Sequence, residues 1–472
     1  CKIKTSFINV IVFFTLIVII QSYLLYVLLL FGTFNQNLLD IYFYVIVSAN
    51  FLFLIYYKES IEKLKNTLNF LFKKHKFFFI YFVIFLLICL LPATDPDSLD
   101  YHLGAPKNWL DEGRIVKNDV WLHFRLASFG EALNIFSIKY FNLNYISFLN
   151  FIYFITLTTI IYQFTTNDNK FLINFFISTP ILIFLIFNQK PHFIGYALII
   201  ISIYLIFLYP GKNNPLFRIL GIIFLCYAAS LKLSFLPTSI LIFVLIFLKS
   251  KKKYSDIFYF TLFSAIFSGI IYYKNFVFYG NPVSPFFDNF FTNKDYLVNF
   301  ANYLKTFGPE FNVINILLFP IKFFIPLSFS ELITNYGFVF LVLLFIRKKL
   351  NLNKNIIFIG VAIFLSVILS AQLSNRYYFH FYFIIILLLG FLSFKKNNFL
   401  KIISISQMIF VFVTLSFYLV SNALVLFNKD YTEKFYSENA YQYEETKWIN
   451  QNIDNHNFTT DIRSRYFFSK NH

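Results

Sequence analysis

The sequence is poor in charge and in cysteine. Only 13% of its 472 residues are charged and 58% are hydrophobic, with a mean hydropathy of +0.66. Soluble domains carry roughly 25% charged residues, so this balance excludes an ordinary soluble domain. Of the three cysteines, Cys89 and Cys226 lie in apolar runs, and the set has no metal-ligand or redox spacing. The composition therefore points to a membrane protein without a cysteine-based centre.

The sequence also lacks polarity alternation and internal repeats. Its apolar runs are continuous, and several approach the roughly 20 residues that a helix needs to cross a bilayer. Continuous runs indicate helices, whereas alternating runs indicate barrel strands. A secretory signal peptide does not account for so many runs, and the lack of repeats disfavours a secondary transporter. We predict an all-α polytopic integral membrane protein with about 13 transmembrane helices.

The predicted spans and the loops between them follow from the apolar runs and the lysines. The spans lie near 5–31, 41–57, 77–92, 145–163, 171–187, 193–209, 216–231, 236–248, 256–273, 331–346, 355–371, 377–394 and 402–427. Two shorter apolar stretches, 126–141 and 311–327, are predicted to be re-entrant or interfacial.

The net charge of +17 comes largely from lysines in short loops. Lysine and arginine favour cytoplasmic loops, so we place the strongly basic loops 57–76, 249–253, 347–354 and 395–401 in the cytoplasm. Counting the predicted spans from these loops puts the following segments outside: 93–125, 188–193, 231–234, 274–330, 373–378 and 428–472. We therefore expect the lipid bilayer, and no nucleic acid, as a partner.

Three regions follow from this topology. Residues 1–76 form N-terminal membrane helices and a basic cytoplasmic loop, and residues 77–427 form the main transmembrane domain. Residues 428–472 are expected to start an extracytoplasmic soluble segment that is cut short, with an amphipathic helix in "YQYEETKWINQNI". Chemistry is expected at the outer face, because loops 93–125 and 274–330 are long and long loops are often functional.

The first outer loop carries Asp95, Asp97 and Asp100 within six residues, before the predicted short surface helix "DYHLGAPKNWLDEG". Asp95 or Ser98 could simply cap that helix. Alternatively, a carboxylate beside an apolar wall and another carboxylate has a raised pKa and can act as a base. A pair of carboxylates can also hold a hard divalent cation.

Cations accompany these carboxylates in the same loop. They are His102, Lys107, Arg114, His123 and Arg125. Cations at the level of lipid headgroups suit a phosphate ligand. The simpler interpretation is that such long side chains reach toward lipid headgroups from the protein surface.

The stretch "TDPDSLDYHLGAPKNWLDEGRI" (94–115) resembles the first extracytoplasmic loop of the GT-C superfamily of polytopic glycosyltransferases. That superfamily includes protein O-mannosyltransferases, aminoarabinose transferases and Rgt-type lipopolysaccharide glycosyltransferases. There, a span ends in an acidic motif that is followed by a tyrosine and a short surface helix. Asp97, Tyr101 and Gly113 match this pattern.

Four further segments are similar to the superfamily in order and character, so that the resemblance runs from about residue 77 to the end. They are "FGEALNIFSIKYF" (129–141) with Glu131, "AASLKLSFLP" (228–237) with Lys232, "YKNFVFYGNPVSPFF" (273–287) and "SNRYYFHFY" (374–382) with Arg376 and Tyr377.

The resemblance implies inverting transfer of a hexose or pentose from a polyprenyl-phosphate donor to a hydroxyl of a glycan, lipid or protein. It implies a location in the bacterial cytoplasmic membrane, with the active site on the periplasmic face and a role in the cell envelope. Asp97 is the expected base, and Asp95 or Asp100 is expected to orient the acceptor. Asp95 and Asp97 are the candidate ligands of a divalent cation (Mg or Mn), if one is needed.

The remaining candidate residues fall into two groups. The expected ligands of the donor's phosphate are Arg376, Lys232, Lys107 and Arg114. The expected residues of the acceptor or donor pocket are Tyr101, His102, Glu131, Lys190, His192 and Tyr377. Three other functions stay open: another GT-C chemistry, such as ligation of whole glycans or transfer of a non-sugar group; a transporter or flippase of a lipid-linked sugar; and a non-catalytic envelope-assembly protein on the same scaffold.

Overall fold

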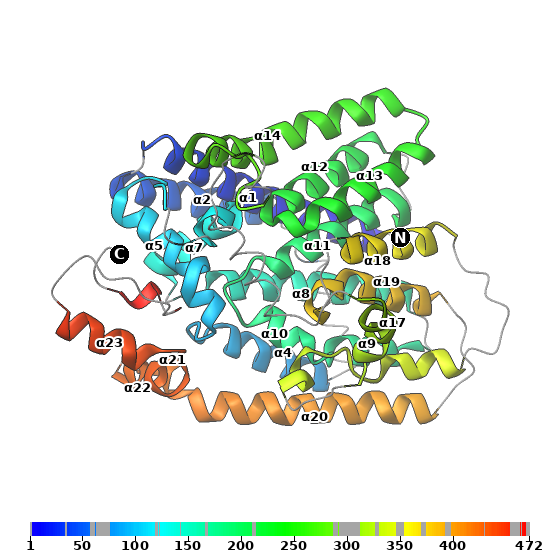
Figure 1. Cartoon of the computed structure of the whole chain (residues 1–472). Helices are drawn as coiled ribbons and strands as arrows, with labels where there is room; N and C mark the ends of the chain where they lie inside the picture. The colour runs from blue at the N-terminus through cyan, green and yellow to red at the C-terminus, as the bar shows by residue number, and fades with distance from the viewer. Residues whose placement is uncertain are drawn as a thin grey trace. The chain divides into compact units, whose positions relative to one another are not determined.

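The protein is described from a computed structural model, drawn in Figure 1. The structure describes residues 2–33, 35–56, 62, 76–118, 121, 123–141, 143–165, 169–209, 214–286, 291, 312–325, 330–345, 354–369, 374–391, 398–428, 430–453, 463 and 465–468. Every regular element in these residues is a helix. The predicted all-α fold class is confirmed for this part of the chain.

The chain divides into two compact units. Unit 1 contains residues 1–148, 188–190 and 418–472, and unit 2 contains residues 149–187 and 191–417. The acidic loop, the three residues Asn188–Lys190 and the C-terminal segment therefore belong to one unit. The predicted boundaries at 76 and 427 describe topology and stay a prediction.

Unit 1 is built around the N-terminal helix and the helices of the acidic loop. Its elements are α1 (Lys2–Leu30), α2 (Gln36–Tyr56), α4 (Lys76–Cys89), η1 (Ser98–His102), α5 (Leu103–Glu112), α6 (His123–Leu126), α7 (Phe129–Tyr140), α21 (Leu424–Phe427), α22 (Asp430–Asn439), α23 (Tyr443–Asn452) and η8 (Arg465–Phe467).

Buried aromatic rings fix the helices of unit 1 to one another. The ring of Tyr26, on α1, meets Phe129, on α7, edge-on at 4.9 Å and Trp109, on α5, edge-on at 6.0 Å between centroids. All three side chains are fully buried. Edge-to-face pairs add about 0.5–1.5 kcal/mol each to the gain from burial. The acidic loop is thereby attached to an apolar helix that could cross a membrane.

Unit 2 contains most of the remaining helices. The helices α8 (Tyr145–Phe164) and α20 (Asn398–Asn422) each contain residues of both units, because the units change at residues 148/149 and 417/418. Its elements are α9 (Phe171–Ile177), α10 (Ile181–Ile186), α11 (His192–Ile203), η3 (Tyr204–Leu208), α12 (Pro215–Leu231), η4 (Leu233–Phe235), α13 (Leu236–Lys249), α14 (Lys253–Tyr279), α17 (Val313–Lys322), η5 (Ser330–Thr334), η6 (Gly337–Phe345), α18 (Lys354–Leu369), η7 (Asn375–Tyr378) and α19 (Phe379–Gly390).

Close helix packing in unit 2 depends on small residues. A Cβ placed on Gly195, on α11, would lie 2.3 Å from the ring of Phe235. Helix α11 packs on α12, and α12 lies beside α14 (Figure 1). The helices around α11 therefore approach more closely than a larger residue at Gly195 would allow.

Four helices in the described part of the chain are long and apolar enough to cross a membrane. They are 9–30 of α1, α8, α14 and α20. Shorter apolar helices occupy most of the other predicted spans, among them α4, α12, α13 and α18. This is the architecture expected of a helical membrane protein, while the total of about 13 spans stays a prediction.

Two predicted spans are interrupted, and one predicted loop begins later than expected. The span 171–187 is split into α9 and α10, because Pro180 has no backbone N–H to continue a helix. In the described part of the span 331–346, one 3₁₀ segment ends at Thr334 and a second begins at Gly337, which has φ +68°. The loop predicted from residue 274 is helical up to Tyr279, where Gly280 ends α14 with φ +72°.

Each of the two short apolar stretches also contains a helix. The stretch 126–141 contains α7, and the stretch 311–327 contains α17. The predicted helix over 100–113 is present as η1 followed by α5, and Gly113 ends α5 with φ +67°. One side of α5 is buried, so this helix lies against the protein more closely than the prediction of a surface helix implies.

Candidate functional site

The candidate site begins just beyond the end of the apolar helix α4. Pro92 lies three residues after the last residue of α4 and cannot continue a helix. Asp95 then starts the next helical turn, because its Oδ1 accepts the backbone N–H of Ser98 at 3.1 Å. A side-chain acceptor at the start of a helix satisfies an amide that has no partner inside the helix. Asp95 thus has the predicted capping role, and it also has a second partner.

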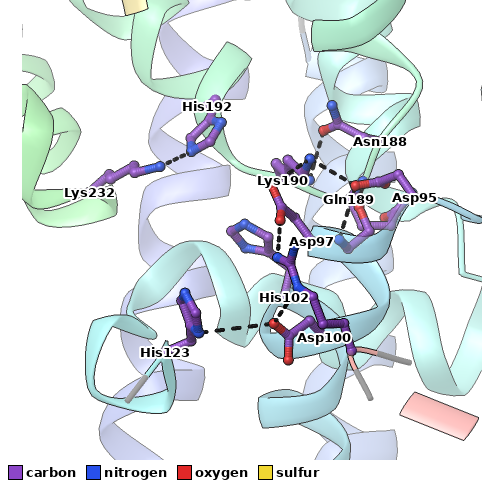
Figure 2. A network of polar contacts seen from close by, with 12 residues as sticks. Asp95, Asp97, Asp100, His102, His123, Asn188, Gln189, Lys190, His192 and Lys232 are labelled. Carbon is purple, nitrogen blue, oxygen red and sulfur yellow. Dashed lines mark hydrogen bonds and ion pairs between the residues drawn. The ribbon is translucent and has the colours of Figure 1, made fainter. Parts of the chain in front are cut away.

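That second partner is Lys190, which lies between two carboxylates of the loop (Figure 2). Its Nζ is 2.8 Å from Asp95 Oδ1 and 3.0 Å from Asp97 Oδ2. Only 3% of the lysine side chain is exposed, against 28% and 25% for the two aspartates. A buried ammonium requires carboxylate partners to offset its desolvation. The structure therefore brings three of the predicted site residues together.

The neighbouring residue, Gln189, anchors this lysine to the rest of unit 1. Its backbone N–H donates to Ser98 Oγ at 3.0 Å, and its carbonyl accepts Asn134 Nδ2 at 3.0 Å. Its side-chain amide donates to Ser147 Oγ at 2.6 Å. Fully bonded polar networks in a core are rigid, so Lys190 is held at a defined position.

A widened helical turn carries the rest of the acidic loop. The N–H of Leu103 donates to the Ser98 carbonyl five residues earlier, which makes η1 a π-type turn. Pro106 has no N–H for the carbonyl of His102, and Asn134 Nδ2 donates to that carbonyl at 2.8 Å instead. Wide turns of this kind occur often at functional sites.

Asp100, in this turn, is completely buried. Burial raises the pKa of its carboxyl, the guanidinium groups of Arg463 and Arg465 oppose this, and the net result is a pKa of about 7. The Nδ1 atom of His123 lies 4.0 Å from Asp100 Oδ2. A carboxyl that titrates near neutral pH is typical of a functional site, although structural networks produce the same shift.

Two arginines from the C-terminal segment meet this loop. Arg463 bonds Asp97 Oδ1 through Nη2, and its Nε lies 3.4 Å from Asp100 Oδ2. Arg465 lies over the ring of Trp121 at 3.8 Å, with its Nε 3.9 Å from Asp100 Oδ1. Each oxygen of Asp97 therefore has one cationic partner, Lys190 on one side and Arg463 on the other.

His102 and Glu131 form a buried pair beside the acidic turn. His102 Nδ1 is 2.7 Å from Glu131 Oε1, and the backbone N–H of Ser128 donates to Glu131 Oε2 at 2.6 Å. Burial raises the pKa of Glu131, but the bonds from His102 and Ser128 outweigh it and hold that pKa below its ordinary value. Glu131 thus completes the capping box of α7 and also orients the His102 ring.

The structure places the other predicted residues of this loop around its edges. Tyr101 stacks on His123 with 5.2 Å between ring centroids. Lys107 Nζ donates to the carbonyl of Phe468, and burial lowers the pKa of this lysine. Arg114 lies against Gly32, beyond the end of α1. Lys107 thus contacts the C-terminal segment, whereas Arg114 lies beside α1.

Unit 2 contains a separate cluster of basic side chains. Lys232 Nζ contacts His192 Nε2, and it lies 5.4 Å from the centroid of the Tyr377 ring. The guanidinium of Arg376 lies 5.1 Å from the same ring, and Tyr196 Oη donates to the Arg376 carbonyl at 2.6 Å. Lys232, His192 and Arg376 therefore lie around the ring of Tyr377, which brings four predicted site residues together.

The fit of a divalent cation can be tested on Asp95 and Asp97. Their nearest oxygens both face Lys190 Nζ, so an ammonium already lies where a cation shared by the two carboxylates would lie. No group of three or more histidine, cysteine, aspartate or glutamate side chains suited to a metal occurs in the part of the chain that the structure describes. In this arrangement the two aspartates do not form a metal site.

The sequence profile of the DUF1420 N-terminal domain matches residues 48–429, which is most of the chain. The chain belongs to the DUF1420 family. No curated protein and no solved structure matches the chain.

The matched DUF1420 region contains both clusters of predicted site residues. Asp95, Asp97 and Lys190 lie inside it, as do Lys232 and Arg376. Arg463 and Arg465 lie beyond its end at residue 429. The acidic site described here therefore combines residues of the DUF1420 domain with a segment that follows it in the chain.

Sequence reasoning missed the residues that complete the acidic site. Arg463 and Arg465 were not predicted, because two arginines in a polar tail carry no motif. Gln189 and Asn134 also escaped notice, although each is buried and polar. A polar residue inside an apolar run, such as Asn134, was the available signal, since buried polar groups require partners.

Proposed function

We propose that the chain is a membrane glycosyltransferase that moves a sugar from a polyprenyl-phosphate donor to an acceptor hydroxyl, with inversion at the anomeric carbon. The observation that carries the proposal is the convergence of Asp95, Asp97 and Asp100 directly after an apolar helix. A base at this position is within reach of a lipid-borne donor and of an acceptor in the aqueous phase. The resemblance of the same loop to GT-C glycosyltransferases supports this assignment.

The proposed reaction needs one base. Asp97 accepts the proton of the acceptor hydroxyl while the acceptor oxygen forms a bond to the anomeric carbon. The bond from that carbon to the donor's phosphate oxygen breaks, and its electron pair leaves with the polyprenyl phosphate. Phosphate is a good leaving group without protonation, so no second carboxyl is needed as an acid, in contrast to a glycoside hydrolase.

Asp97 is preferred as the base over its two neighbours. Its side chain is 25% exposed, whereas Asp100 is completely buried and Asp95 accepts the Ser98 amide at the start of the helical turn. An acceptor hydroxyl must come within about 3 Å of the base, so access comes before pKa in the choice. In this scheme Asp100 supports the position of the arginines and Asp95 holds Lys190.

The departing phosphate needs positive charge close by. Lys232 and Arg376 stay the predicted phosphate ligands of unit 2, and their common contact with Tyr377 supports a joint role. Guanidinium and ammonium groups bind phosphate by complementary means, the first by a flat pair of N–H donors and the second as a point charge. The extracytoplasmic location of the reaction and its bacterial inner membrane are part of this proposal.

The test uses the full-length protein in phosphatidylcholine nanodiscs. A panel of polyprenyl-phosphate sugars and a crude envelope extract as acceptor would be added, with and without EDTA, and the release of polyprenyl phosphate measured. Release from one donor supports the transferase and names the sugar, and the EDTA arm decides whether a metal is required. If folded protein releases polyprenyl phosphate from none of the donors, the transferase is wrong, and a transporter or assembly role replaces it.

A further inference from the structure

Arg463 and residues 465–468, in the C-terminal segment, contact the acidic loop of the same unit. Arg463 contacts Asp97 and Asp100, and the carbonyl of Phe468 accepts a hydrogen bond from Lys107. A Cβ placed on Gly104 would lie 3.3 Å from Arg465 Cβ and 3.8 Å from the Tyr466 backbone nitrogen. Residues 465 and 466 are therefore in close contact with α5, the helix within the acidic loop.

Helices α22 and α23, and the turn between them, also contact these residues. The backbone N–H of Arg463 donates to Gln442 Oε1 at 2.9 Å, and Asn450 Nδ2 donates to the Phe467 carbonyl at 2.9 Å. The Phe467 ring meets the rings of Tyr436 and Tyr443 edge-on at 4.9 and 4.8 Å. These contacts bring Arg463 next to the proposed base through its backbone, while its side chain is 21% exposed.

The contact of Arg463 with Asp97 conflicts with the role of Asp97 as a base. Lys190 bonds one carboxylate oxygen of Asp97 and Arg463 bonds the other. A carboxylate with cations on both oxygens is stabilised as the anion and takes a proton poorly. An acceptor hydroxyl can use Asp97 only after one of these cations has moved.

Arg463 is the cation that can move. Lys190 is 3% exposed and fixed by its buried neighbours, whereas Arg463 is 21% exposed and comes from a different segment of the chain. Arginine presents a flat pair of N–H donors that matches phosphate as well as carboxylate. A phosphate group at the acidic loop would therefore compete with Asp97 for this guanidinium.

We propose that Arg463 is a ligand for the phosphate of the lipid donor and that Asp97 holds it until the donor binds. Arrival of the phosphate draws Arg463, together with residues 465–468, away from Asp97 and α5, so that donor binding and release of the base occur in one step. Without a donor Asp97 stays paired with Arg463. It therefore does not accept a proton from water. This inference rests on the proposed glycosyltransferase function and adds a phosphate ligand from outside the DUF1420 match.

The first test uses the short distance between Gly104 and Arg465. The geometry of a disulfide requires Cβ atoms about 3.5–4.5 Å apart, close to the 3.3 Å found for this pair. The double variant Gly104→Cys/Arg465→Cys, in a chain with Cys1, Cys89 and Cys226 replaced by alanine, should therefore cross-link the segment to α5. The cross-linking rate would be measured in phosphatidylcholine nanodiscs with a polyprenyl phosphate, with the matching polyprenol, or with inorganic phosphate.

The proposal predicts that polyprenyl phosphate slows cross-linking severalfold, that inorganic phosphate does so only at high concentration, and that polyprenol has no effect. Equal rates in all arms, or equal slowing by polyprenol, would overturn it. An effect of inorganic phosphate as strong as that of the lipid would support a phosphate site but assign it to a free anion. The assay requires no sugar transfer, so its result stands even if the proposed transferase activity is absent.

A second test measures donor kinetics in variants that leave the cross-link out. Arg463→Gln removes the charge, Arg463→Lys keeps it, and Lys447→Gln removes an exposed cation of α23 that pairs with Glu433 on α22. Loss of a hydrogen bond to a charged group corresponds to roughly 10- to 150-fold, so Arg463→Gln should raise the donor KM by about that factor. Arg463→Lys should restore part of the loss, and Lys447→Gln should match the parent chain.

A purely structural arginine gives a different pattern. If Arg463 only stabilises the fold, Arg463→Gln lowers the amount of active protein and thus kcat, with an unchanged donor KM, and that result would refute the inference. Full transfer activity in the oxidised Gly104→Cys/Arg465→Cys protein, equal to that after reduction with dithiothreitol, would refute it as well. In either case the transferase itself would stand.

Discussion

Lys190→Met is the change that tests most directly how the acidic loop is held together. The substitution keeps the length of the side chain and removes the charge that Asp95 and Asp97 share at 2.8 and 3.0 Å. At these distances, with an effective dielectric constant of about 20, each pair contributes roughly 6 kcal/mol before desolvation is subtracted. Removal of one partner from a buried ion pair costs about 3–5 kcal/mol in net stability.

Water reduces this figure, because the two carboxylates are 28% and 25% exposed although the lysine is 3% exposed. Exposed pairs contribute only about 0–1 kcal/mol, so we expect Lys190→Met to lower the free energy of unfolding by about 2–3 kcal/mol. Unfolding would be followed in detergent by denaturant titration, with tryptophan fluorescence, to which the buried Trp109 contributes, as the signal.

Lys139→Met is the matched control for this prediction. Lys139 pairs with Asp40 at 3.2 Å in the same unit, but the two side chains are 23% and 43% exposed. We expect this control to lose at most about 1 kcal/mol. Equal losses in the two variants would refute the reasoning that burial makes the Lys190 contacts strong.

Two further predictions concern Asp100 and Gly195. The pKa of Asp100 is raised from 3.8 to about 7, so the folded state binds more protons than the unfolded state between these values, and stability falls as pH rises through this range. Asp100→Asn should remove this slope, on the order of 4 kcal/mol in total, and unfolding titrations at pH 4.5 to 8 that keep the slope would contradict it. Gly195→Ala places a methyl group 2.3 Å from the Phe235 ring and should cost about 1–3 kcal/mol. The double variant with Phe235→Leu should recover most of that loss in the same assay, and no recovery would show that the clash lies elsewhere.

Much of the fold class could be read from the sequence, because apolar runs of membrane length have few alternatives. Several helices follow directly from apolar periodicity, capping residues and glycine. They are α4, the helix α5 within the acidic loop, and the helix at 443–452. The break inside 171–187 was less visible, although Pro180 marks it. Hydropathy averages over such a break, whereas the backbone has to satisfy hydrogen bonds residue by residue.

The candidate site was predicted only in part, for a physical reason. Asp95, Asp97 and Asp100 are close in sequence, and their clustering at a membrane boundary is visible without a structure. Lys190 was predicted as a pocket residue, but its place between two of these carboxylates depends on contacts of Gln189 that no local pattern contains. Arg463 is more than 360 residues from Asp97, and a pairing over that distance leaves no trace in a single sequence.

The positions of Glu131 and His102 show a second limit of sequence reasoning. Both were predicted to line a pocket, and the structure pairs them with each other at 2.7 Å in a buried capping arrangement. A glutamate at the third position after Ser128 fits a capping box as well as it fits a catalytic motif. Whether the pair also meets a substrate stays a prediction.

The central claim is that Asp97 acts as a base in sugar transfer, and one measurement tests it most directly. The release of polyprenyl phosphate from the preferred donor would be compared in nanodiscs for the parent chain, Asp97→Asn and Asp430→Asn, whose aspartate lies on the exposed side of α22. The account predicts a loss of about 10²–10⁴-fold for Asp97→Asn, the range for a general base, with an unchanged rate for Asp430→Asn. Release by folded Asp97→Asn at the rate of the parent chain would contradict the account.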